Sequence, residues 1–148
     1  MKIVQATVED IPRIMECARL FTRELPDCTL NEMHYASQWT RFLEEGYGVI
    51  FLMVDEADYV AGGIGGICNP DLITGLKEAV ELFWYVKPEH RGCMDSVRML
   101  KRFETWASQQ GCCHVSMIHM ESSMPVKLKQ FYGHRGYSLL ETVYRKSL

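Results

Sequence analysis

Glu81 is the residue whose position points most directly to chemistry. It interrupts the apolar run Ala79–Val86, which is predicted to be a strand. A carboxylate in such a strand is costly to bury unless it is paired or has a chemical role. Burial would raise its pKa toward the range of a general base at neutral pH. Glu81 is therefore the candidate base, with Glu78 as the second candidate. In the competing interpretation, Glu81 faces solvent at a strand edge or pairs with an arginine.

A tight turn follows this strand and leads into a helix. The turn, Lys87–Cys93, contains Pro88 and Gly92, and apolar residues at helical spacing then predict a helix over Met94–Gln110. Backbone amides at such a helix start, together with the helix dipole, can bind an anion such as a phosphate. Gly92 would let the backbone come close to a bulky ligand.

Tyr132 lies in a second motif, in which residues 131–137 read F-Y-G-H-R-G-Y. A helix is predicted from Pro125 to about Arg135, and Gly136 ends it before a final extended segment. The hydroxyl of Tyr132 could donate a proton to a leaving group. The competing interpretation is a core aromatic residue whose hydroxyl is hydrogen-bonded.

Together the two motifs resemble those of the GNAT N-acetyltransferases. Residues 88–92 (P-E-H-R-G) resemble the family's acyl-CoA pyrophosphate loop, and the Tyr132 segment resembles its terminal L-Y-x-x-x-G-F unit. The resemblance implies an α/β (α+β) fold with a mixed central sheet that is split like a V and flanked by helices. It implies that acetyl-CoA, as co-substrate, lies in the opening. By this resemblance the cofactor-binding residues are Phe83, Tyr85, Val86, Arg91, Gly92, Cys93, Met94, Asp95 and Ser96.

The implied reaction is a direct attack of a primary amine on the thioester carbonyl. Glu81 would remove the amine's proton, through a water molecule, and Tyr132 would protonate the departing CoA thiolate. The family's loop usually reads R-G-x-G-x-G, whereas Met94 and Ser96 stand here at the later glycines and Asp95 adds a negative charge. Two alternatives remain open: an acetyltransferase for protein N-termini or lysines, and a catalytically weakened GNAT-like protein with a CoA-binding or regulatory role.

The apolar patterns predict elements in the order β-α-α-β-β-β-α-β-α-β. In the second helix, Met33, Ala36, Trp39 and Phe42 or Leu43 are expected to face inward. Four glycines between positions 62 and 66 resemble a phosphate loop, but no lysine and no helix follow them. They are interpreted as strand glycines at a bulge or a close backbone approach. The predicted elements are Lys2–Ala6, a helix from about Ile11 to Pro26, a helix from Asn31 to Gly46, Val49–Val54, Tyr59–Cys68, Ala79–Val86, Met94–Gln110, His114–Ile118, Pro125 to about Arg135, and Tyr137–Ser147.

Composition limits the class of protein. The 148 residues fit one domain, 1–148, and the net charge of −3 argues against nucleic acid as a partner. The longest apolar run, Val49–Val54, is too short to span a membrane, and no signal peptide is recognised, so a cytoplasmic location is expected. The six cysteines are expected to be reduced thiols, and without a C-x-x-C pair no metal site is predicted. The resemblance further implies a possible homodimer.

Overall fold

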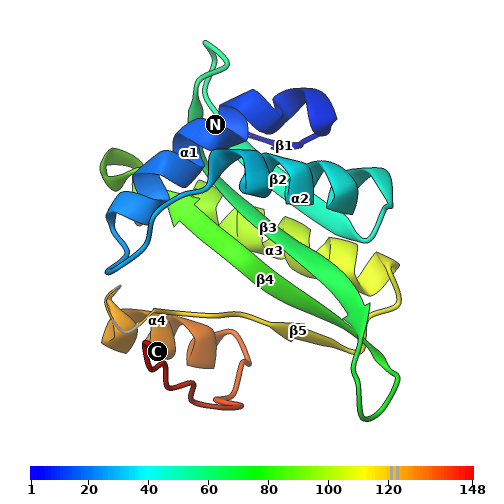
Figure 1. Cartoon of the computed structure of the whole chain (residues 1–148). Coiled ribbons are helices and arrows are strands. Elements are labelled where there is room, and N and C mark those ends of the chain that lie inside the picture. The colour runs from blue at the N-terminus through cyan, green and yellow to red at the C-terminus, as the bar shows by residue number, and fades with distance from the viewer. Residues whose placement is uncertain (121, 123) are drawn as a thin grey trace. The chain divides into compact units, whose positions relative to one another are not determined.

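The computed structural model describes residues 1–148 apart from 121 and 123 and divides the chain into two compact units, Met1–Ile118 and His119–Leu148 (Figure 1). The first unit contains a five-stranded sheet in the order β1-β2-β3-β4-β5. The pairs β1–β2, β2–β3 and β3–β4 are antiparallel. The pair β4–β5 is parallel. The strands are β1 (Lys2–Gln5), β2 (Gly48–Val54), β3 (Val60–Pro70), β4 (Lys77–Val86) and β5 (His114–Ser116).

Helices cover both faces of this sheet (Figure 1). On one face lie α1 (Ile11–Arg23), which follows the short helix η1 (Val8–Asp10), and α2 (Glu32–Glu44). On the other face lies α3 (Met94–Gln109), which follows the short helix η2 (Pro88–His90). Strand β2 is buried throughout after its first residue, as expected for a strand with helices on both sides.

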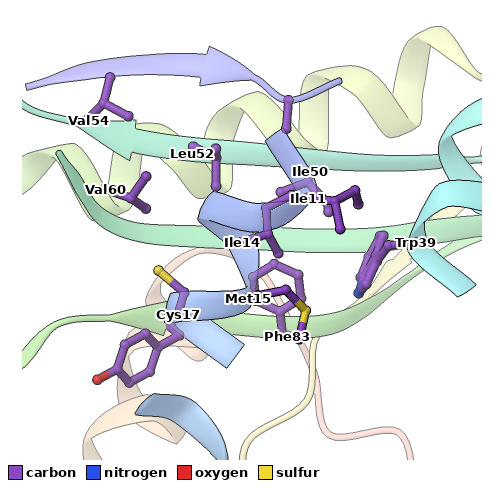
Figure 2. Packing of buried hydrophobic residues seen from close by; sticks show 12 residues of the cluster. Ile11, Ile14, Met15, Cys17, Trp39, Ile50, Leu52, Val54, Val60 and Phe83 are labelled. Atoms are coloured by element: carbon purple, nitrogen blue, oxygen red, sulfur yellow. The ribbon is translucent and has the colours of Figure 1, made fainter. Parts of the chain in front are cut away.

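The core between α1, α2 and the sheet forms as the helical periodicity predicts (Figure 2). Trp39 of α2 packs edge-on against Phe83 of β4, with 5.5 Å between ring centroids. Met33, predicted to face inward, is 85% exposed, so that prediction is wrong. It lies in the first turn of α2, where all residues up to His34 are exposed, and burial begins only at Tyr35. The remaining labelled members are Ile11, Ile14, Met15, Cys17, Ile50, Leu52, Val54 and Val60.

The glycines of β3 allow aromatic rings to approach the backbone from both faces. A Cβ atom at Gly65 would lie 2.5 Å from the Phe83 ring and 2.7 Å from the Trp39 ring. A Cβ atom at Gly66 would lie 2.6 Å from the ring of Phe103, which belongs to α3. These separations leave no room for a side chain. The interpretation of the glycine run as close backbone approach within a strand is confirmed.

The second unit contains α4 (Pro125–His134) followed by a segment without regular structure. The predicted strand over Tyr137–Ser147 does not form, because none of the described residues pairs with it and a strand needs the hydrogen bonds of a neighbour. Several apolar side chains in this segment are exposed, among them Leu140 and Tyr144. Among the described residues, no helix has the length and apolar character needed to cross a membrane.

Candidate active site

The sheet splits between β4 and β5 after only three residue pairs. Glu78–Val80 pair with His114–Ser116. Within the described residues, no strand pairs on that side with the rest of β4, Glu81–Val86. The backbone of these six residues is therefore an open strand edge, where an extended ligand can add hydrogen bonds.

A β-bulge lies at the point where the split begins. The register between β3 and β4 passes from Gly66 opposite Glu81 to Gly65 opposite Phe83, so Leu82 has no partner of its own. Leu82 is 44% exposed, whereas its neighbours Glu81 and Phe83 are buried. Bulges of this kind bend a strand and redirect its side chains, and they are frequent beside active sites.

Glu81 is buried at this point, with 4% of its surface exposed. Its Oε2 atom accepts a hydrogen bond of 3.0 Å from the backbone N–H of Ile118. Burial raises the pKa of Glu81 to about 7, and the Ile118 hydrogen bond offsets only part of that rise. Among the described residues, no lysine or arginine lies within ion-pair distance of Glu81. Glu81 is thus buried, and the ion pairs found among the described residues do not include it; its raised pKa suits proton exchange near neutral pH.

Glu78, the second candidate base, has a different role in the structure. Its Oε1 atom accepts a 2.5 Å hydrogen bond from the hydroxyl of Ser116, which lies on β5. The carboxylate therefore links β4 and β5 where they are still paired. Glu81, by contrast, lies where the pairing has ended.

The predicted cofactor-binding residues of β4 direct their side chains into the protein. Phe83 is 5% exposed and packs against Trp39, and Tyr85 is 4% exposed and lies beside Phe21. Val86 is half-buried. What this half of β4 offers to a ligand is therefore its backbone.

Arg91 lies in the turn after β4 and holds a carboxylate of α1's C-cap residue. Its Nη2 atom donates to both carboxylate oxygens of Glu24, at 2.6 and 2.8 Å, and its Nε atom donates to the carbonyl of Val86 at 2.8 Å. The hydroxyl of Tyr85 also donates to Glu24, at 3.4 Å. The guanidinium thus joins the turn both to α1 and to the end of β4.

The start of α3 leaves its backbone amides without a side-chain cap. Gly92 has a φ of 78°, a conformation that glycine adopts without strain, and there is open space where a side chain would project. Cys93 occupies the N-cap position but makes no capping hydrogen bond within the described residues. Met94 is 73% exposed, and the hydroxyl of Ser96 donates to the carbonyl of Cys93. Free amides at a helix start favour an anionic group.

Asp95 forms ion pairs with two neighbouring cations. Its carboxylate accepts hydrogen bonds from the terminal amine of Met1, at 3.2 Å, and from Arg98, at 2.5 Å. The Met1 amine, and after it Arg98, hold the pKa of Asp95 below its usual range. Part of the negative charge that this residue adds to the turn is thus compensated.

Tyr132 lies in the second unit, where α4 places it in an aromatic group. It is 7% exposed, and its ring centroid is 5.5 Å from that of Tyr137 and 6.4 Å from that of His119. The backbone carbonyl of Tyr132 accepts a hydrogen bond from the N–H of Tyr137, which closes the end of the helix. The ring is thus fixed in position within its own unit.

Two groups in this candidate site could not be predicted from the sequence. Glu24, which binds Arg91, lies 67 residues before it, and the Ile118 amide lies 37 residues after Glu81. Neither belongs to a local motif, and a backbone amide has no residue type by which a pattern could select it. No group of three or more histidine, cysteine or acidic residues arranged to hold a metal occurs in the part of the chain that the structure describes.

A known protein family matches most of the chain. The family model described as "Acetyltransferase (GNAT) family" matches residues 14–137. No curated protein shows a significant match to the sequence.

Solved structures share the fold at low sequence identity. An acetyltransferase from Trypanosoma brucei matches with a TM-score of 0.76 at 16% identity, covering 99% of both chains. Glucosamine-6-phosphate N-acetyltransferase from Arabidopsis thaliana matches with a TM-score of 0.76 at 16% identity, covering 99% of this chain and 97% of that one. Ribosomal-protein-alanine N-acetyltransferase from Brucella melitensis biovar Abortus 2308 matches with a TM-score of 0.74 at 13% identity, covering 100% of both. Since the family model spans most of the sequence, this chain belongs to the GNAT acetyltransferase family.

Proposed function

We propose that this protein transfers the acetyl group of acetyl-CoA to a primary amine, by direct attack within a ternary complex. Family membership supports the reaction class. The observation that carries the proposal is Glu81, a buried carboxyl group with a pKa of about 7 at the point where β4 and β5 separate. A base for this reaction must accept a proton near neutral pH, and Glu81 meets that requirement.

In the proposed reaction, Glu81 takes a proton from the substrate ammonium through a water molecule. The nitrogen lone pair of the resulting amine attacks the thioester carbonyl carbon and forms the amide C–N bond. The nitrogen, now bonded to the carbonyl carbon, releases its second proton to solvent; the C–S bond breaks, and the sulfur leaves as the CoA thiolate. Tyr132 donates its phenolic proton to that thiolate, and solvent returns a proton to the tyrosine.

The chain has groups suited to the donor substrate. The open backbone edge of Glu81–Val86 is proposed to pair with the amide groups of the pantetheine arm. The amides of residues 91–96 are proposed to bind the diphosphate, because no side chain described here caps the start of α3. The contacts of Asp95 with Arg98 and the Met1 amine reduce its repulsion of that anion.

Calorimetric titration with acetyl-CoA, followed by an amine panel, tests the proposal. We expect micromolar binding, a higher melting temperature in the presence of acetyl-CoA, and thiol release with at least one amine. A panel of amino sugars and polyamines beside peptides with free N-termini or lysines separates a small-molecule acceptor, which we propose, from a protein acceptor. A folded protein that gives a flat titration would exclude acetyl-CoA as the donor.

We extend the proposal in three respects: residues 1–148 form a single domain, two copies of the chain form a homodimer, and the protein is cytoplasmic. Family resemblance supports the dimer. Light scattering that gives a single 17.1 kDa species would contradict the dimer.

A further inference from the structure

Two thiols of the first unit, Cys68 and Cys112, lie in contact, and neither has a role in the proposed acetyl transfer. Their Sγ atoms are 3.0 Å apart, although 44 residues separate them in the sequence. Cys68 is on β3 and is 8% exposed, and Cys112 follows α3 and is partly buried. A disulfide bond has an S–S length of about 2.05 Å, so the two sulfurs need to approach by only about 1 Å. We propose that Cys68 and Cys112 are a redox modification site that forms an intramolecular disulfide.

Backbone hydrogen bonds hold both cysteines in place. The N–H of Cys68 donates to the carbonyl of Tyr47 at 2.7 Å, and the N–H of Cys112 donates to the carbonyl of Ala107 at 3.0 Å. The next residue, Cys113, donates its N–H to the carbonyl of Lys77 at 2.8 Å. The proximity of the two sulfurs is therefore a property of the sheet and of the end of α3, which carry these hydrogen bonds.

The oxidation is a two-electron step for which a hydroperoxide is the oxidant class. One thiolate attacks the peroxide oxygen to give a sulfenic acid and, from hydrogen peroxide, water. The second thiol attacks the sulfenic sulfur, and the S–S bond forms with release of a second water. Burial, and then the neighbouring Cys68, raise the pKa of Cys112 to about 12, so attack on the peroxide by the Cys112 thiolate accelerates as the pH rises.

The disulfide would strengthen the closed end of the split sheet. Cys68 pairs across β3 and β4 with Ala79, and Cys112 stands two residues before β5, whose first residue, His114, pairs with Glu78. Only three residue pairs join β5 to β4. A covalent link from β3 to the segment entering β5 therefore adds a constraint where hydrogen bonding is sparse.

The test uses the full chain with Cys28→Ser and Cys113→Ser, which removes the two exposed thiols and leaves four of the six cysteines. Diamide, a diazene that accepts the two hydrogen atoms, should lower the thiol count from four to two. Peptide mapping should find residues 68 and 112 linked. The melting temperature should rise by about 5–10 °C and return to its starting value after reduction with dithiothreitol.

A triple variant that adds Cys112→Ser is the matched control, and it should keep all three of its thiols under diamide. If this variant fails to fold, the mapping of the parent protein decides alone. Four thiols remaining after diamide treatment, or a link that joins any other pair, would overturn the proposal.

Discussion

Glu81 and Glu24 are two carboxylates near the open half of β4 whose surroundings differ in burial and in charge. Glu81 is 4% exposed and accepts one hydrogen bond from a backbone amide. The Glu24 side chain is 40% exposed and is held by the guanidinium of Arg91. Burial without a cation raises the pKa of Glu81 to about 7, whereas an exposed ion pair contributes little to stability. The first carboxylate is suited to proton transfer, and the second to holding a turn in place.

Glu81→Gln tests whether Glu81 transfers a proton in the reaction, and it has the largest expected effect. We expect the acetyl-transfer rate near pH 7 to fall by about 10²–10⁴-fold, because the amide cannot accept a proton. In the unmodified protein the rate should rise as the pH increases through about 7, where Glu81 loses its proton. The defect of the variant should shrink at higher pH, where free amine is already present. Initial rates from pH 6 to 10 measure both effects.

Glu78→Gln is the matched control, since Glu78 lies three residues away on the same strand and binds Ser116. Its rate should stay within a few-fold of the parent rate. A larger loss at neutral pH for this variant than for Glu81→Gln would exchange the assignments of the two carboxylates.

Tyr132, like Glu81, is buried, so its burial alone does not show whether it has a chemical or a structural role. Tyr132→Phe distinguishes the two roles. The substitution keeps the ring contacts with Tyr137 and removes one hydroxyl. We expect the rate to fall by about 10²–10⁴-fold while acetyl-CoA affinity hardly changes, since the hydroxyl acts on the leaving group in the transition state. Steady-state kinetics and calorimetry give the two quantities. Unchanged turnover would mean that the tyrosine is structural.

The raised pKa of Glu81 also predicts a pH dependence of stability. Its folded-state value of about 7 lies above the usual 4.5, so the folded state binds more protons between these two pH values. The contribution of Glu81 to the free energy of unfolding should therefore fall by about 2–4 kcal/mol as the pH rises from 4.5 to about 7. Urea unfolding of the parent and of Glu81→Gln at pH 4.5, 6 and 8 measures the difference. Parallel pH profiles for the two proteins would show that Glu81 titrates normally.

Glu24→Gln carries the smallest expected effect. Because the Glu24–Arg91 pair is exposed, the free energy of unfolding should change by less than about 1 kcal/mol. The guanidinium would be released to interact with the diphosphate, so the KM for acetyl-CoA should fall about 2–5-fold with kcat unchanged. Glu32→Gln, which breaks the more exposed Arg19–Glu32 pair, is the control and should leave KM unchanged. A rise in KM for Glu24→Gln would mean that Glu24 positions Arg91 for binding.

The sequence by itself determined most of the helices and strands, and it singled out Glu81 as a candidate site residue. The apolar periodicities placed the helices and the five strands within a few residues of their observed bounds. Local geometry sets these periods, because a helix buries every third or fourth side chain and a half-buried strand every second. Glu81 could be selected because a carboxylate contradicts the apolar pattern of its strand.

Only the tertiary structure decided which distant groups meet. The Ile118 amide at Glu81, Glu24 at Arg91, and Cys112 at Cys68 are separated by 37, 67 and 44 residues. Such contacts follow from strand order, register and the packing of helices on the sheet, which no local pattern encodes. The same reason explains the absent strand after α4. Its residues have strand-forming character, but a strand exists only where the fold provides a partner edge.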